Sequence, residues 1–155
     1  MSNHKVKNWQ WIILGIIIAF SLFLKIYYNY HWPKAKVKIN ARVFNVLVAD
    51  NKKNWIKGLG GRDNLGNYDG MIFLFPTQQQ HVFVMRDMRF PIDIIWIKNG
   101  VVVDFAPNVP LDLAKTESEL VPYAARDVSD RVLELKAGTA QQLNLKIGDK
   151  VDILR

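Results

Sequence analysis

The clearest pattern in the chain is a pair of apolar runs separated by only two residues. Ile92–Lys98 and Val101–Phe105 are both rich in β-branched residues, and only Asn99-Gly100 lies between them. Asn-Gly at such a junction is typical of a type I′ turn, so the sequence predicts a two-residue β-hairpin. Asp93 interrupts the first run on the same strand face as Ile95, because strand side chains alternate with a period of two.

Shorter apolar segments predict the remaining elements. Apolar alternation begins at Val37 and changes phase at Phe44, which indicates a hairpin turn near Asn40 to Arg42. Further strands are expected at residues 71–75, 81–85, 131–135 and 151–154. Asp50 is the expected N-cap of a short helix over residues 51–59, ended by Gly60-Gly61, and a second short helix is expected within 138–143. Residues 107–123 contain three prolines, which predicts a long loop.

These elements predict a mainly β fold with a minor α component. Many short strands with two short helices are typical of a compact β-sandwich or a partly open barrel. We expect this globular domain to occupy residues 37–155.

One long apolar segment precedes the domain. Trp9 to Tyr28 is 20 residues long and is interrupted only by Gln10, Ser21 and Lys25. A helix of this length spans about 30 Å, the thickness of a hydrocarbon core. The sequence therefore predicts one transmembrane helix at 9–28, between a tail at 1–8 and a basic tether at 29–36. A cleaved signal peptide is the alternative, but no small-residue cleavage site follows the run.

The net charge of +7 comes entirely from this N-terminal part. Residues 50–155 contain 14 acidic and 14 basic side chains, so the predicted domain is neutral. The charge therefore gives no support to a nucleic-acid partner. We expect the lipid bilayer to be a partner through residues 9–28, in a single-pass cell-membrane protein whose C-terminal domain is extracytoplasmic.

Three stretches of the domain resemble one protein family in order and spacing. They are Gly58-Leu59 with Arg62, Leu65, Gly70–Phe73 and Phe75; Phe83 and Met85 with Pro91–Ile95; and Arg131–Leu135 with Ala137-Gly138 and Gly148-Asp149. Together they resemble the domain of unknown function 192 family. The resemblance implies a shared fold and an exported or membrane-anchored bacterial or archaeal protein, and it implies no established reaction. The chain departs from the family pattern at Gly60, Val84, Asp87 and Met88.

Charged residues within these apolar motifs are the candidate site. A charge in such a strand is costly unless it is paired, so Asp93 requires a cation or backbone donors. Arg62 and Arg86 are the candidates if that partner is a cation, because arginine can pair with a carboxylate through two hydrogen bonds. We predict either a structural ion pair or a pocket that binds a small polar or anionic ligand or an envelope protein. The candidate ligand-binding residues are Arg62, Met71, Met85, Arg86, Asp93, Arg131 and Glu134.

Two other chemistries fit these residues less well. Asp93 with Glu134 would make an envelope hydrolase if both carboxylates faced one cleft. His81 with Met71, Met85 and Met88 has ligands that suit Cu(I), but methionine is also ordinary core filler. Trp55, Phe83, Phe90 and Trp96 could line a face that binds a sugar or a peptide, but aromatic residues in a small β domain are more often core residues. A purely structural or assembly role is the third alternative.

The chain has no cysteine, which excludes disulfides and thiolate metal sites. The sequence predicts no metal site and no cofactor. It therefore favours a membrane-anchored binding or accessory domain over an enzyme.

Overall fold

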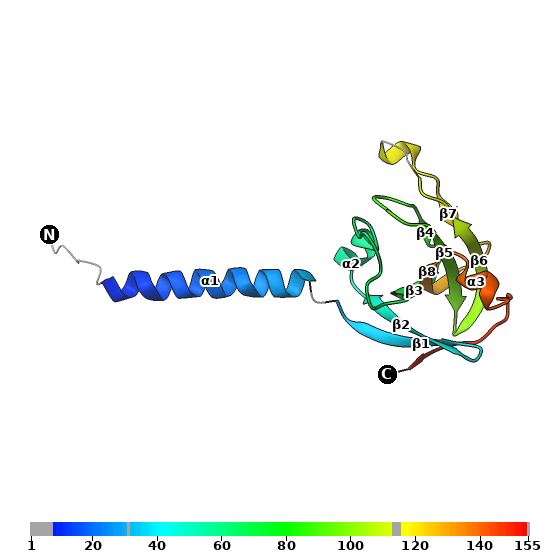
Figure 1. Ribbon diagram of the computed structural model, residues 1–155, viewed down its shortest axis with the longest axis horizontal. Helices are drawn as coiled ribbons and strands as arrows, with labels where there is room; N and C mark the ends of the chain where they lie inside the picture. Colours follow the sequence, from blue (N-terminus) through cyan, green and yellow to red (C-terminus); the bar gives the residue numbers. More distant parts are fainter. Residues whose placement is uncertain (1–7, 31, 113–115, 155) are drawn as a thin grey trace. The chain divides into compact units, whose positions relative to one another are not determined.

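The computed structural model describes residues 8–30, 32–112 and 116–154. The chain divides into two compact units, Met1–Trp32 and Pro33–Arg155. The first contains helix α1 (Asn8–Tyr30). The second, here called the β domain, contains every strand (Figure 1).

The helix predicted for the N-terminal apolar segment is present, but a membrane span is not. α1 includes all of residues 9–28. In the part of the chain that the structure describes, no helix combines the length and the apolar character needed to cross a membrane. The prediction of a transmembrane anchor is corrected accordingly. Apart from Asn8, the predicted tail lies outside the described residues. The first strand begins at Lys34, within the segment predicted as a tether.

The β domain is built on one seven-stranded sheet with the order β6-β5-β8-β3-β2-β1-β9. Only β2 and β3 run parallel, and the other neighbours are antiparallel. A second sheet pairs β4 with β7. The strands are β1 (Lys34–Ile39), β2 (Arg42–Ala49), β3 (Gly70–Gln79), β4 (Val82–Phe83), β5 (Ile92–Lys98), β6 (Val101–Val109), β7 (Tyr123–Ala124), β8 (Ser129–Lys136) and β9 (Val151–Leu154). The short helices are α2 (Lys52–Lys57), η1 (Glu117–Glu119) and α3 (Thr139–Gln142).

The large sheet curls until its two edge strands meet at one end. The Val102 amide donates to the Asp149 carbonyl over 2.9 Å, and the Val151 amide donates to the Gly100 carbonyl over 2.8 Å. Pairing there is limited to an isolated bridge between Val101 and Lys150, so the barrel is only partly closed. The prediction of a mainly β fold is confirmed, and of the two predicted architectures the partly open barrel is observed rather than the sandwich.

Turn chemistry explains the two predicted hairpins. Asn99 and Gly100 have φ of 53° and 77°, as a type I′ turn requires at both central positions. Asn40, with φ of 55°, turns β1 into β2, where the sequence pattern changes phase. Both hairpins are confirmed.

Several predicted boundaries were wrong for identifiable reasons. α2 begins later than predicted because Asn51, not Asp50, is its N-cap and accepts a hydrogen bond from the Asn54 amide. β6 continues through Pro107, which is tolerated because β6 is an edge strand. β3 likewise continues through Pro76, where its register with β8 is interrupted. Residues 107–123, predicted as one loop, therefore include the end of β6, η1 and the start of β7.

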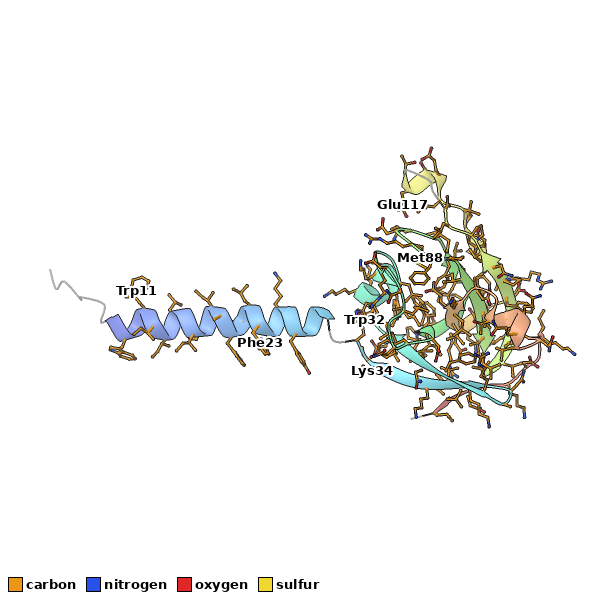
Figure 2. All side chains as sticks on the ribbon, viewed as in Figure 1. Trp11, Phe23, Trp32, Lys34, Met88 and Glu117 are labelled. Atoms are coloured by element: carbon orange, nitrogen blue, oxygen red, sulfur yellow. The ribbon has the colours of Figure 1, made fainter. Side chains whose placement is uncertain are left out.

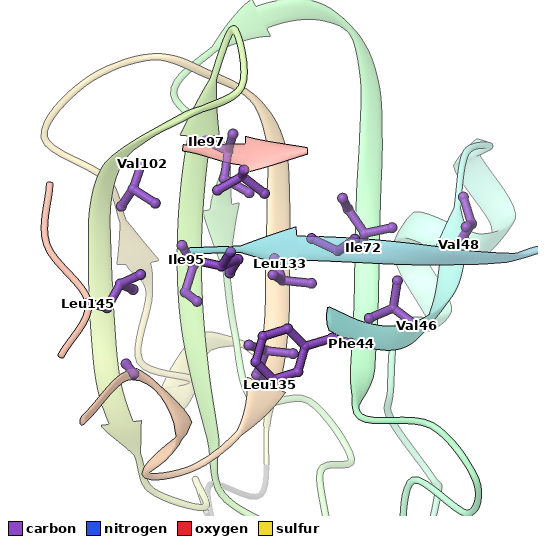
Figure 3. Packing of buried hydrophobic residues seen from close by; sticks show 14 residues of the cluster. Phe44, Val46, Val48, Ile72, Ile95, Ile97, Val102, Leu133, Leu135 and Leu145 are labelled. Carbon is purple, nitrogen blue, oxygen red and sulfur yellow. The ribbon is translucent and has the colours of Figure 1, made fainter. Parts of the chain in front are cut away.

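The sheet has two buried faces. Its concave face forms the main core, in which Ile72, Ile95, Ile97 and Leu133 are completely buried (Figure 3). By strand alternation, Phe73, Trp96 and Glu134 belong to the opposite face. That face packs under the segment 81–85: Phe73 makes an edge contact with Phe83 at 4.9 Å, and the Trp96 indole donates to the His81 carbonyl over 3.1 Å.

Candidate functional site

A cavity of about 250 Å³ opens on this second face, beside α2 and the segment 81–88. Its aromatic walls come from α2, β3 and β4. Three basic side chains lie on its lining as well. The residues that define it here are Trp55, Phe73, Phe75, His81, Phe83 and Glu134 inside, with Lys52, Lys57, Arg86 and Met88 around them. We call it the Glu134 cavity.

Glu134 is a buried carboxyl in an apolar position of the sheet. β8 places it directly between Met71 of β3 and Ile94 of β5, which are both buried. Glu134 is 5% exposed, and among the described residues its Oε2 has no hydrogen-bond partner. Burial raises the pKa of Glu134 to about 8, because the carboxylate form loses its hydration there. The neutral acid therefore predominates at pH 7.

His81 is the second buried polar group on the cavity wall. Its ring stacks on Phe75 with centroids 3.5 Å apart, and its Nδ1 lies 3.4 Å from Nε2 of Gln79. Nε2 of His81 is buried and has no hydrogen-bond partner among the described residues. Burial lowers the pKa of His81, against smaller opposing effects of neighbouring backbone carbonyls and Asp130. Two polar groups without net charge thus share an aromatic cavity.

Asp93 lies on the other face and has a structural role. It is completely buried, and its carboxylate accepts hydrogen bonds from the amides of Asn108 (2.7 Å), Gly138 (3.2 Å) and Ala140 (2.7 Å). These donors tie β5 to the end of β6 and to the start of α3. Of the two kinds of partner predicted for Asp93, the backbone donors are confirmed and the ion pair with an arginine was wrong.

The predicted hydrolase pair is not assembled. Asp93 is opposite Leu135 in the β5–β8 register, and Ile94 is opposite Glu134. Since adjacent strand positions face opposite sides of the sheet, the two carboxylates point away from each other. They share no cleft.

The other candidates are dispersed. Arg86 pairs with Glu117 through a bidentate contact, in which Nε donates to Oε2 over 2.8 Å. Nε of Arg131 lies 3.9 Å from Oδ2 of Asp130. The Arg62 side chain is half-buried, and burial is the main cause that lowers its pKa. Met71 and Met85 are core residues, 0% and 1% exposed. Of the seven predicted residues, Glu134 and Arg86 line the cavity.

The sequence prediction found part of the cavity wall, since Trp55 and Phe83 were weighed as a binding face, but it missed Phe73 and Phe75. Phe73 and Phe75 follow a period of two in β3, which is also the pattern of ordinary core residues. His81 was considered only as a copper ligand, together with Met71, Met85 and Met88. Of these methionines, Met88 lines the cavity, whereas the first two are core residues.

The four positions at which the resemblance implies departures from the family pattern lie close together beside this cavity. Gly60, Val84 and Met88 all line the cavity. A Cβ on Gly60 would lie 2.8 Å from the Arg86 carbonyl oxygen and 3.4 Å from Cβ of Asp87. A larger residue at position 60 would therefore displace the segment that carries the other three.

A second, larger cavity of about 740 Å³ lies beside β2 and α3. Two of its polar side chains already have partners. Asp69 accepts a hydrogen bond from the Asn45 amide over 2.7 Å, and Arg42 donates to Gln142 over 3.2 Å. Of the two cavities, the smaller one has buried polar atoms left without partners among the described residues.

Comparisons with known proteins agree on the fold and the family. The sequence model of the domain of unknown function 192 family, described as "Uncharacterized ACR", matches residues 35–153. A crystal structure of a protein of unknown function from Novosphingobium aromaticivorans DSM 12444 is similar with a TM-score of 0.68 and 31% identity, covering 77% of this chain and 84% of that one. A crystal structure from Sinorhizobium meliloti 1021, described as a "putative transcription regulator", has a TM-score of 0.67 and 23% identity over 79% of this chain and 95% of that one. No curated protein matches the chain.

Proposed function

This chain belongs to the domain of unknown function 192 family, and we propose that its β domain is a binding module that holds a small organic ligand in the Glu134 cavity. The observation that carries the proposal is the buried Oε2 of Glu134, which has no hydrogen-bond partner among the described residues. Buried polar groups in folded proteins are rarely left in this state.

Two other buried carboxylates of the same domain show the contrast. Asp93 accepts three backbone hydrogen bonds. Asp104, on β6, accepts from the amides of Phe105 and Arg126 and from the Arg126 guanidinium. Carboxylates with a structural role are therefore fully partnered in this fold. An unpartnered group costs about 1–3 kcal/mol, which a ligand hydrogen bond would recover.

The cavity also limits the size and character of the ligand. A volume of about 250 Å³ is that of about eight water molecules in the liquid. Aromatic rings form much of the wall, and a few polar groups are available to orient the ligand, as is usual for small-molecule sites. We expect a compact molecule with an apolar body and at least one hydrogen-bonding group.

A fragment screen by thermal shift on the full-length protein tests this proposal. A ligand at one hundred times its Kd stabilises the native state by about 2.7 kcal/mol, which corresponds to several degrees in Tm. Val84→Trp is expected to abolish the shift because the larger ring fills the cavity, and Glu134→Gln is expected to reduce it. Each variant is compared with its own ligand-free Tm.

Arg131→Gln is the matched control, because Arg131 is half-buried but does not line the cavity. It is expected to keep the full shift. A library without any saturable hit, or hits that persist unchanged in Val84→Trp, would contradict the proposal.

The cell-membrane location is a separate proposal that does not require a membrane span. Its support is the apolar surface of α1, from which Trp11 and Phe23 project (Figure 2) and are 62% and 60% exposed. A large exposed apolar surface is typical of a helix that binds a partner or a membrane. We propose that α1 lies against the cell membrane and that the β domain is on the extracytoplasmic side.

Cell fractionation tests this location. The full-length protein is expected in the membrane pellet, and a variant without residues 1–32 is expected in the supernatant. Protease added to intact cells is expected to degrade the β domain. Full-length protein in the supernatant would refute the membrane location, and a protected domain would refute the orientation.

A further inference from the structure

Charge is distributed unevenly along the Glu134 cavity. Its two buried polar groups carry little charge at neutral pH, since burial raises the pKa of Glu134 and lowers that of His81. Its charged lining residues are all basic: Lys52 and Lys57 of α2, and Arg86. Both lysines are exposed, so their charges are at the solvent end of the cavity.

Two acidic side chains, Glu117 and Asp87, partly offset this positive charge by their interaction with Arg86. Glu117 of η1 pairs with Arg86 and lies at the same end of the β domain as Met88 (Figure 2). Glu117 is 65% exposed and does not line the cavity. Three basic side chains against two acidic ones leave the opening with a net positive charge.

From this arrangement we infer that the ligand is an organic anion with an apolar or aromatic body, whose charged group lies at the opening beside Lys52, Lys57 and Arg86. The inference rests on the proposed function and identifies the chemical class of its ligand. The body of the ligand lies against Trp55, Phe73 and Phe75, and a polar atom of the ligand can reach Glu134 or His81.

The reverse polarity does not fit the cavity. A cationic ligand with its charge at the opening would face three basic side chains. A cation placed deep in the cavity would need an ionised Glu134, which burial between Met71 and Ile94 opposes. A neutral ligand could use the aromatic wall but would gain nothing from the lysines.

Three probes with the same ring separate these classes: phenylacetate, 2-phenylethanol and 2-phenylethylamine. Their Kd values are measured by NMR titration of the full-length protein at pH 7. Phenylacetate is expected to bind about tenfold more tightly than the amine, with the alcohol between them. Raising the salt concentration to about 0.5 M is expected to weaken the binding of phenylacetate and to leave the Kd of the alcohol unchanged, because salt screens interactions between charges.

Two sets of variants assign the effect to the opening. The double variant Lys52→Gln/Lys57→Gln is expected to raise the Kd of phenylacetate about fivefold and to change the Kd of the alcohol less than twofold. The matched control is Lys146→Gln/Lys150→Gln, a pair of exposed lysines that do not line the cavity. Glu117→Gln is expected to strengthen phenylacetate binding, because it removes a negative charge and releases Arg86. Such a gain cannot arise from misfolding.

The outcomes separate this inference from the proposed function. If the alcohol or the amine binds as tightly as phenylacetate and Val84→Trp abolishes that binding, the anion inference is overturned and the binding module stands. If none of the three probes binds while uncharged fragments from the screen do, the inference is again overturned. If the screen also yields no ligand sensitive to Val84→Trp, both fail.

Discussion

Replacing Asp93 with alanine is expected to destabilise the protein by about 3–5 kcal/mol. The carboxylate is completely buried and accepts hydrogen bonds from the amides of Asn108, Gly138 and Ala140. Removing it leaves three backbone N–H groups without an acceptor. Each buried donor without an acceptor destabilises the folded state by nearly the full free energy of its desolvation. The same substitution would remove the hydrogen bonds that connect β5 to the end of β6 and to the start of α3.

Asp93→Asn distinguishes lost hydrogen bonds from lost volume. Asparagine has nearly the same shape, but its amide nitrogen cannot accept the hydrogen bond that Oδ2 receives from Ala140. We expect about half of the alanine effect, measured by urea unfolding with tryptophan fluorescence. The exposed Asp152→Asn on β9 is the control and should stay within about 0.5 kcal/mol of wild type. Wild-type stability in Asp93→Ala would show that these amides find other acceptors.

The sequence predicts the burial of Asp93 and its need for a cation or backbone donors, but not which of the two it has. A period of two places it with Ile95 and Ile97, and both are indeed in the core. Its donors, however, are backbone amides of residues 15, 45 and 47 positions later in the chain. Backbone amides have no sequence signature, so the sequence alone could not decide between them and the arginines of the motif.

The hairpins could be predicted because the residues of their turns determine the backbone conformation locally. Asn99 and Gly100 adopt positive φ at little cost, and this alone fixes the turn between β5 and β6. The strand order could not be obtained in this way. The parallel pairing of β2 with β3 and the contact between β6 and the start of β9 depend on long-range packing.

The sequence predicted only some residues of the candidate site, because only some of them stand out from their neighbours in the sequence. Glu134 was selected because a charge within an apolar strand needs an explanation, and this argument depends only on the sequence. Trp55 and Phe83 of the aromatic wall were candidates for a binding face, whereas Phe73 and Phe75 were not, because their spacing is that of ordinary core residues. Only the folded chain shows that these rings leave a space beside His81 and Glu134.

Asp93 and Glu134 are neighbours in the sheet with opposite electrostatic environments. Asp93 is surrounded by donors that stabilise a carboxylate. Glu134 lies between Met71 and Ile94, and burial is the cause of its raised pKa. The raised pKa of Glu134 makes the stability of the protein depend on pH, and this dependence can be measured.

Glu134→Gln is expected to make the protein more stable at neutral and alkaline pH. The pKa of Glu134 rises from 4.5 to about 8 on folding, so between these values the folded state binds a proton that the unfolded state lacks. Stability therefore falls as pH rises through this window, by up to about 1.4 kcal/mol per pH unit. Below about pH 4.5 both states are protonated and this contribution is absent. Glutamine does not titrate, so the substitution removes the loss.

The measurement is the difference in unfolding free energy between Glu134→Gln and wild type from pH 4 to 9, by urea unfolding. The difference should increase from about pH 5 to 8 and then level off. His81 titrates in both proteins, so its opposing effect cancels in the difference. Glu117→Gln is the control: its pairing with Arg86 lowers the pKa of Glu117, so its effect should change only at acidic pH. A flat difference for Glu134→Gln between pH 5 and 8 would mean that Glu134 is ionised when folded. The buried carboxyl would then have a partner, and the main support for the binding module would be lost.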